Sequence, residues 1–371
     1  MEGIAAVKFN VKDRPEFYQV LKKRVNRYFK ENGISKNANL NMKLKTAFML
    51  LLYFSPWVLM IGGIATGTWA VLGMWLLMSL GMSGIGLSIM HDANHGSYSK
   101  DKRVNYALGF LIAFIGGYHT TWKIQHNVLH HSFTNIDGYD EDISKQGIIR
   151  FSPNQKRKSI FKFQAFYAPF LYGIMTIYWL VGKDFEQLIR YNKKNLLESQ
   201  GVTLSKAIMQ VILNKIGYYS LFVAIPLIAI DLPWWQVLGG FFLMHFISGL
   251  TLAFIFQLAH VIEETNFYAT DENGSVENNW AIHQLRTTAN FANENRLFSW
   301  LIGGLNYQVE HHLFPNICHV HYPKISIIVK ETAREYNLPY LQHKTIAGAI
   351  KSHFSLLNQL GTGKYDLKLA G

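Results

Sequence analysis

Residues 46–91 read TAFMLLLYFSPWVLMIGGIATGTWAVLGMWLLMSLGMSGIGLSIMH, which is 46 consecutive positions without aspartate, glutamate, lysine or arginine. A membrane span needs about 20 apolar residues, so this run is long enough for two helices. Gly67 and Thr68 stand near its middle and mark a tight turn, which places the predicted spans at residues 46–66 and 69–90. The run therefore predicts a helical hairpin within a membrane.

The same pattern recurs farther along the chain. Between residues 216 and 262 only Asp231 is charged, and the Leu-Pro pair that follows it signals a turn. We therefore expect a second hairpin, with spans over residues 216–231 and 234–258. A soluble fold would have to bury both runs inside a chain of 371 residues. The pattern favours an all-α integral membrane fold with four transmembrane helices in two hairpins.

The composition indicates a membrane protein with a substantial polar part. Hydrophobic residues make up 49% of the chain and charged residues 16%, against about 25% charged in soluble proteins. The 36 basic and 24 acidic residues leave a net charge of +12, which suits an anionic membrane surface or nucleic acid. The charge-free runs favour the membrane, and we expect no nucleic-acid partner. The single cysteine, Cys318, excludes a disulfide framework.

The placement of basic residues predicts the orientation in the membrane. Residues 1–45 carry 11 lysines or arginines against 4 acidic residues, residues 92–215 are also basic, and the two hairpin tips have neither lysine nor arginine. The positive-inside rule then places both termini and the central segment in the cytosol. We divide the chain into a basic cytosolic segment (1–45), a membrane domain (46–345) and a cytosolic tail (346–371).

Eight of the fifteen histidines lie beside the predicted spans, in three short motifs and at one further position. HDANH contains His91 and His95, HNVLHH contains His126, His130 and His131, QVEHH contains Gln308, His311 and His312, and FQLAH ends at His260. Histidines four apart share one face of a helix. Because all eight are predicted on the cytosolic side, they indicate a shared metal site in a histidine-rich cytosolic cap.

Two shorter charge-free stretches, residues 104–122 and 163–182, are each just long enough to cross the membrane. If either one crossed, it would separate histidine motifs to opposite sides. We therefore expect both to be interfacial helices, with aromatic side chains at the level of the lipid headgroups.

The number and type of ligands narrow the choice of metal. Eight imidazoles exceed the four ligands of a tetrahedral zinc ion, so two metal ions are expected. Imidazole binds iron, copper, zinc and nickel alike, which leaves the metal open on this ground. Soluble di-iron bundles use Glu-x-x-His pairs, and no histidine of this chain has glutamate three positions before it. The pattern points to a different oxygen-activating design.

The HDANH, HNVLHH and QVEHH motifs, with their spacing around two hairpins, resemble the membrane-bound fatty acid desaturase family over roughly residues 40–345. The third motif begins with glutamine, and in this it resembles the third motif of the front-end subgroup, which contains desaturases of delta-6 and delta-5 type. These enzymes insert a double bond between an existing one and the carboxyl end. The resemblance implies a di-iron centre that uses O2 as co-substrate, with these ligands: His91, His95, His126, His130, His131, His260, His311 and His312.

Three further residues are candidates for contact with a metal or for support of its ligands. Gln308 stands where other desaturases have a ligating histidine, so it is expected to contact a metal directly or through water. Asp92 is a candidate partner that orients an imidazole. His283 is a candidate ninth ligand, with packing or support of a ligand as the favoured alternative. The acidic loop after the second motif (Asp137, Asp140, Glu141 and Asp142) is expected to be a solvated turn.

The resemblance also implies the partners. The substrate would be a fatty acyl chain carried by CoA or by a phospholipid in the membrane. The sequence contains no His-Pro-Gly-Gly haem motif, so we expect a separate ferredoxin or cytochrome b5 as electron donor. Two alternatives stay open: a membrane di-iron hydroxylase of lipid chains and, from another class, a metal transporter or metal-binding membrane protein. A transporter should have ionisable ligands along a path inside the spans, whereas these histidines gather at helix ends.

Overall fold

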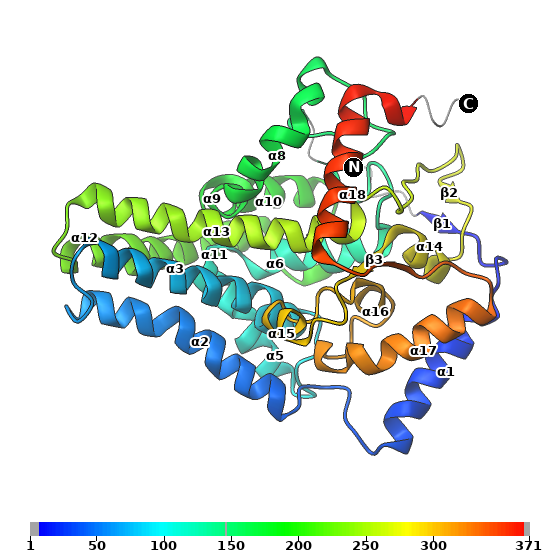
Figure 1. The fold of residues 1–371 in the computed structure, drawn as a ribbon, viewed down its shortest axis with the longest axis horizontal. Helices are drawn as coiled ribbons and strands as arrows, with labels where there is room; N and C mark the ends of the chain where they lie inside the picture. Colours follow the sequence, from blue (N-terminus) through cyan, green and yellow to red (C-terminus); the bar gives the residue numbers. More distant parts are fainter. Residues whose placement is uncertain (1–6, 145–146, 367–371) are drawn as a thin grey trace. The chain divides into compact units, whose positions relative to one another are not determined.

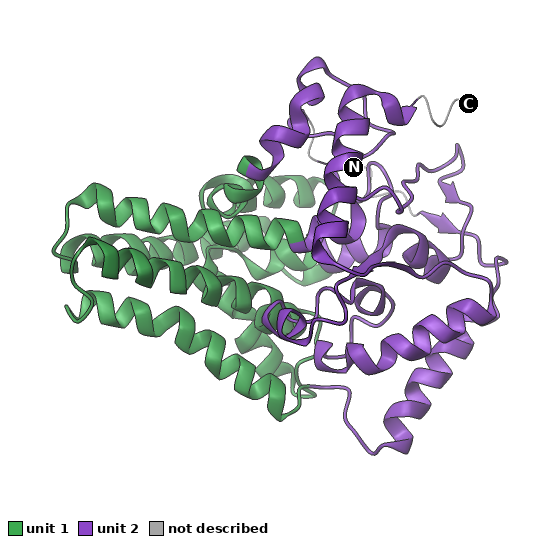
Figure 2. Ribbon diagram, viewed as in Figure 1, with its two compact units in different colours: residues 1–3, 38–124, 170–254 green, residues 4–37, 125–169, 255–371 purple. Residues whose placement is uncertain are grey.

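The computed structural model describes residues 7–144 and 147–366, which are mostly helical (Figure 1). The described residues form two compact units, coloured separately in Figure 2. Unit 1 contains residues 38–124 and 170–254, and unit 2 contains residues 7–37, 125–144, 147–169 and 255–366. The first six and last five residues of the predicted cytosolic ends lie outside the described residues.

Unit 1 is built around long apolar helices that run side by side in Figure 1. Within the described residues, four helical stretches are long and apolar enough to cross a membrane: Leu40–Ile61, Thr68–Asn94, Leu204–Ala229 and Trp234–His260. They comprise α2 (Leu40–Ile61), α3 (Thr68–Gly84) with η1 (Ile85–Ile89) and α4 (Met90–Asn94), α11 (Leu204–Tyr219) with η7 (Ser220–Ala224) and α12 (Ile225–Ala229), and α13 (Trp234–His260), whose residues 255–260 belong to unit 2. The all-α fold with four membrane-capable helices is confirmed.

Two of these helices begin well before the charge-free runs do. Helix α2 begins after Asn39, whose side chain accepts a hydrogen bond from the Met42 amide at 3.1 Å. Helix α11 likewise begins after Thr203, whose hydroxyl caps the Lys206 amide at 3.4 Å. Capping residues therefore set the start of each helix, and lysines fall inside its first turns.

The two shorter charge-free stretches are both interrupted. Residues 104–122 fall in α5 (Lys102–Gly109), the 3-10 helix η2 (Phe110–Ile115) and α6 (His119–Lys123), and Gly116 with φ +90° ends η2. The second stretch is covered by η4 (Ser159–Phe163), α8 (Gln164–Gly173), α9 (Met175–Tyr178), η5 (Trp179–Lys183) and α10 (Asp184–Lys193), with a bend of 56° at Ile174. A short turn, η6 (Glu198–Gln200), leads to α11. Neither stretch forms a straight spanning helix.

A buried ion pair fixes α11 against the start of α10 in unit 1. The ammonium of Lys215 lies 2.8 Å from a carboxylate oxygen of Asp184 and donates to the carbonyls of Gly116 and Trp179 at 2.6 and 2.8 Å. The other oxygen of Asp184 accepts a hydrogen bond from the Thr121 hydroxyl at 2.7 Å. Both charged groups are buried, so removing one would leave the other without compensation.

We expect Lys215→Met to lower the free energy of unfolding of the detergent-purified protein by about 3–5 kcal/mol, because the Asp184 carboxylate stays buried without its cation. Thermal or denaturant unfolding followed by circular dichroism measures the change. Lys206→Met is the matched control, since Lys206 is exposed on the same helix and should change stability by less than about 0.5 kcal/mol. Equal losses in both variants would contradict the structural role of the pair.

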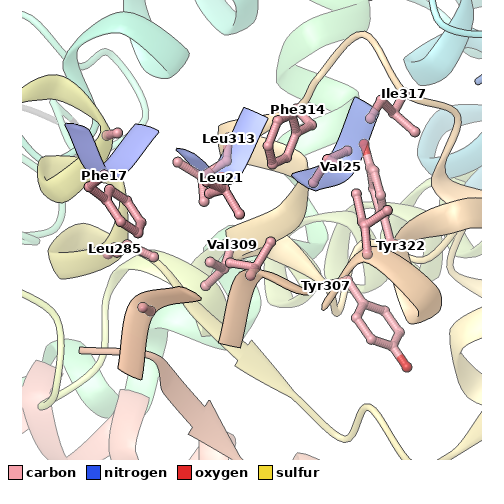
Figure 3. Packing of buried hydrophobic residues seen from close by; sticks show 14 of the residues in the cluster. Phe17, Leu21, Val25, Leu285, Tyr307, Val309, Leu313, Phe314, Ile317 and Tyr322 are labelled. Atoms are coloured by element: carbon pink, nitrogen blue, oxygen red, sulfur yellow. The ribbon is translucent and has the colours of Figure 1, made fainter. Parts of the chain in front are cut away.

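Unit 2 has its own hydrophobic core (Figure 3). Helix α1 (Glu16–Glu31) buries Phe17, Leu21, Val25 and Phe29, which are spaced four apart and so form one face. This face packs with α14 (Trp280–Thr287), α16 (Gln308–Leu313) and α17 (Tyr322–Glu335). The other elements of unit 2 are η3 (Ile124–His130), which starts at the unit boundary, α7 (His131–Phe133), α15 (Arg296–Leu301), η8 (His319–His321) and α18 (Ile346–Thr362).

Four short strands pair in parallel within unit 2. Strand β1 (Lys8–Phe9) pairs with β2 (Ser275–Val276), and β3 (Ala289–Phe291) pairs with β4 (Leu341–His343). Asn290 of β3 accepts a hydrogen bond with its side chain from the Val309 amide of α16 at 2.9 Å. The core and this contact hold α16, which carries the third histidine motif, in a fixed position.

Candidate metal centre

Unit 2 brings six of the eight predicted histidines together in two groups of three. His126 lies in the π-helix η3, His131 follows it in α7, and His311 lies in α16. Their Nε2 atoms converge: His131 is 3.2 Å from His126 and 2.9 Å from His311, and His126 is 3.4 Å from His311. A neutral imidazole has one N–H and one lone pair, so three nitrogens facing one point cannot all satisfy each other. Lone pairs on all three would satisfy a metal ion.

The second group contains His130, His260 and His312, all buried. One ring nitrogen of each lies within 4.8 Å of the others. The Nδ1 atoms have partners elsewhere: the carbonyl of Thr287 is 3.1 Å from His260, and the amide oxygen of Gln284 is 2.9 Å from His312. Nε2 of His130 is buried with no hydrogen-bond partner among the described residues, which leaves it for a metal.

The two groups are in direct contact. The rings of His131 and His312 stack with centroids 4.3 Å apart and an angle of 19° between their planes. The ring of His130 lies edge-on to both His131 and His312. Six imidazoles in two adjacent groups fit two metal ions better than one.

The local backbone explains how HNVLHH serves both groups. Residues 124–130 form a π-helix, in which hydrogen bonds run from residue i to i+5 and the turn is wider than in an α-helix. His131, five positions after His126, therefore comes onto the same face as His126. The neighbouring His130 points to the second group. We expected His126 and His130 to share one helix face, and their rings do stack, with centroids 5.5 Å apart. The helix is a π-helix rather than an α-helix, and its wider turn also brings His131 beside His126.

Asp140 holds His130 in place, although we expected the whole acidic loop to be a solvated turn. That expectation is wrong for Asp140, which is 0% exposed. Both of its carboxylate oxygens lie 3.1 Å from Nδ1 of His130, and each also accepts a backbone N–H at 2.9 Å, from Asn135 and from Asp142. This leaves Nε2 of His130 for a metal, a common arrangement at metal sites.

The same carboxylates set the charge of His130. Burial lowers the pKa of its imidazole, but Asp140 and Asp142 outweigh that effect and raise it to about 9. A metal ion would replace the proton on Nε2, while the proton on Nδ1 stays in the hydrogen bond to Asp140.

Helix α14 contacts residues of both groups through Gln284 and His283. The Gln284 amide bonds to His312 and also donates to the carbonyl of His131 at 3.2 Å. His283, a candidate from the sequence, lies in neither group: its Nε2 is 2.7 Å from the carbonyl of Thr134. Burial lowers the pKa of His283 to about 4, so the neutral ring donates to that carbonyl. Thr134 in turn bonds to the His130 carbonyl at 2.8 Å, which places His283 in a supporting position.

Gln308 begins α16, the helix that carries His311 and His312. Its side chain is buried and close to His260. Neither of its amide atoms makes a hydrogen bond of normal geometry with a described residue, so the amide is available to a metal or a water molecule. Glu310, on the same helix, is also buried, and it accepts hydrogen bonds from Asn290 and Tyr340, each at 2.9 Å.

The remaining predicted residues belong to unit 1. His91 lies in α4 and His95 directly follows this helix; their ring centroids are 4.8 Å apart, and both rings contact the indole of Trp122 edge-on. An Asp92 carboxylate oxygen is 3.5 Å from Nδ1 of His91. The preceding residues form a second π-helix, η1, so each of the first two motifs follows or lies in a widened turn. Such turns are often found at functional sites.

Sequence reasoning missed Asp140, Gln284 and Thr134 as supports of the histidines. Gln284 and Thr134 carry no motif, and Gln284 is far in sequence from the residues that it touches. Asp140 offered a weak signal, because a carboxylate close behind a histidine motif is a common partner of metal-bound imidazole.

Known proteins that are similar in sequence point to the same family as the histidine motifs of the site. Residues 66–344 match the family model for fatty acid desaturase. The chain is 36% identical over 349 residues to an sn-1 linoleoyl-lipid 6-desaturase of Synechocystis, an alignment that covers 93% of this chain and 95% of the relative. It is 34% identical to an acyl-lipid (8-3)-desaturase of Physcomitrium patens, over 98% of this chain and 75% of the relative.

A third relative, delta(5) fatty acid desaturase A of Dictyostelium discoideum, is 30% identical over 94% of this chain and 75% of its own length. The family match covers most of the chain and includes all three histidine motifs. The chain therefore belongs to the fatty acid desaturase family.

Proposed function

We propose that the chain is an O2-dependent acyl desaturase with two iron ions, held by His91, His95, His126, His130, His131, His260, His311 and His312. The observation that carries this proposal is the convergence of imidazole nitrogens in two adjacent groups of three in unit 2. Bound iron would supply the oxygen-dependent redox chemistry that removes hydrogen from an alkyl chain.

The reaction removes two hydrogen atoms from neighbouring CH2 groups and leaves a cis double bond. O2 is reduced to two water molecules, with two electrons and two protons supplied from outside. The chain's own residues keep the imidazoles correctly turned, because their Nδ1 atoms are bound to Asp140, Gln284 and the Thr287 carbonyl. The burial of these histidines keeps bulk water away from the reacting atoms.

We infer that both termini and the metal centre face the cytosol, where a separate ferredoxin or cytochrome b5 delivers the electrons. The net charge of +12 supports a small acidic carrier. The relatives named as acyl-lipid desaturases support a fatty acyl substrate bound to a membrane lipid.

We further propose that the new double bond forms on the carboxyl side of an existing one. The support is Gln308, which places a neutral amide at the start of the third motif, and the relatives named as 6-desaturase and delta(5) desaturase. Asp92 and His283 act in this proposal as supports of ligands: Asp92 lies beside His91, and His283 holds Thr134.

In a host without desaturases that is fed linoleate, we expect a new cis bond at carbon 6 or 5. Gas chromatography with mass spectrometry of derivatised fatty acids locates the bond. Gln308→Ala should lose most of the activity, because the buried amide is removed beside the metals, and Gln308→His tests whether a ligating side chain restores it. Gln342→Ala is the matched control, since Gln342 is exposed. A bond on the methyl side, a hydroxylated product or action on saturated chains alone would contradict the proposal.

A further inference from the structure

A basic cavity lies away from the histidines in unit 2. It has a volume of about 390 Å³, and it is lined by Arg157, Lys158, Ser159, Lys162, Gly361 and Thr362. These residues come from two segments that are far apart in the sequence: the start of η4 with the residues before it, and the end of α18. The lining combines three cationic side chains with two hydroxyls and has no carboxylate.

The frame of the cavity is well fixed. At Gly361 a Cβ atom would lie 2.1 Å from the carbonyl oxygen of Phe161, so the absence of a side chain lets α18 and η4 touch through their backbones. The buried Gln164 donates to the carbonyl of Leu357 in α18 at 2.7 Å. Arg157 donates to the carbonyl of Thr362 at 2.7 Å, which places its guanidinium at the edge of the cavity.

Among residues 7–144 and 147–366, no acidic side chain neutralises the charges of the cavity. No carboxylate of the described residues forms an ion pair with Arg157, Lys158 or Lys162. Three cations converging on one small space favour an anion with several oxygens, and the planar fork of an arginine matches the geometry of a phosphate.

Exposed apolar side chains stand on the same segment. Ile160, Phe163 and Phe166 are 57%, 63% and 90% exposed, and their spacing of three puts them on one side of the helical turns. The segment also forms the beginning of the helix pair Ser159–Gly173 and Met175–Lys193. Together these two helices are apolar and long enough for a broken span. Cations beside exposed aromatic residues at the start of an apolar helix are typical of a membrane interface.

We propose that this cavity binds the phosphate of an anionic phospholipid headgroup, while Ile160, Phe163 and Phe166 insert among acyl chains of the same leaflet. A lipid is favoured over free phosphate and over CoA, because only the lipid also satisfies the exposed apolar side chains. An anionic headgroup is favoured over a zwitterionic one, because the latter adds a cation to a lining that already holds three. This site does not depend on the desaturase reaction.

Native mass spectrometry of the full-length protein in a non-ionic detergent tests the proposal, with phosphatidylglycerol or phosphatidylcholine added at equal concentration. We expect tighter binding of phosphatidylglycerol. The triple variant Arg157→Gln, Lys158→Gln and Lys162→Gln should weaken its binding about a hundredfold, by about fivefold for each lost cation. The matched control is Lys23→Gln, Arg27→Gln and Lys30→Gln on α1, which removes the same charge from exposed positions and should leave binding unchanged.

A second variant covers the case in which loss of the Arg157 bond to Thr362 unfolds the triple variant. Lys158→Gln with Lys162→Gln keeps that bond and should still weaken binding roughly thirtyfold. Equal binding of phosphatidylglycerol to the wild type and the double variant would overturn the proposal. So would equal binding of the two lipids, an equal loss in the control, or displacement of the lipid by the same concentration of inorganic phosphate or CoA.

Discussion

His312→Ala should reduce desaturation to background and lower the iron content of the purified protein below two ions per chain. The ring of His312 contacts His130, His131 and His260, and its Nδ1 is held by Gln284. Its loss therefore affects both groups. Loss of a residue that only supports a ligand costs about 10–100-fold in metal affinity or activity, so loss of a ligand should exceed about a hundredfold. His130→Ala should have the same effect.

Metal analysis and product analysis of the same preparations measure both effects. The matched control is His321→Ala: His321 is buried in unit 2 with Nε2 3.1 Å from the carbonyl of Asn37, and it belongs to neither group. It should keep the iron content and the activity. Membrane insertion should be unchanged in all three variants, because α13 and the other apolar helices are untouched. One zinc and no iron in active wild-type protein would contradict the di-iron proposal.

Much of the fold could be predicted because a membrane imposes a simple rule on sequence. A long charge-free run has to be helical in lipid, since its backbone groups have no other partners there. The exact ends could not be predicted from charge. Lys215 is tolerated inside α11 because Asp184, on a different helix, neutralises it. That contact depends on tertiary structure and cannot be recognised from the charge-free run of residues alone.

Some residues of the site could likewise be predicted from the sequence, and others could not. The histidines could be found because ligating side chains are rare residue types that recur at short spacing. Which histidine joins which group depends on the π-helix at residues 124–130, and the residue types of HNVLHH fit an α-helix equally well. The supports could be found only from the structure, since Gln284 reaches His312 and the His131 carbonyl across long distances in the sequence.

Asp140→Asn should weaken iron binding about 10–100-fold while the protein stays folded. The two carboxylate oxygens of Asp140 share the Nδ1 atom of His130, and each accepts one backbone N–H. Asparagine has nearly the same shape, but one oxygen becomes an NH2 group that cannot accept. The variant therefore loses one backbone contact as well as one of the two negative charges beside His130, since Asp142 remains 3.4 Å from its Nδ1. The imidazole is then both less firmly oriented and less basic toward a metal.

Iron retention measured against rising concentrations of a chelator gives the affinity without reference to activity. Asp137→Asn is the matched control, because it makes the same change in the same loop, and Asp137 has no described contact with a histidine. It should release iron at the wild-type chelator concentration. If Asp140→Asn also did so, Asp140 would be a structural residue of the loop. If it released iron early but kept wild-type thermal stability, the loss would come from the orientation of His130, since a merely structural defect would lower both.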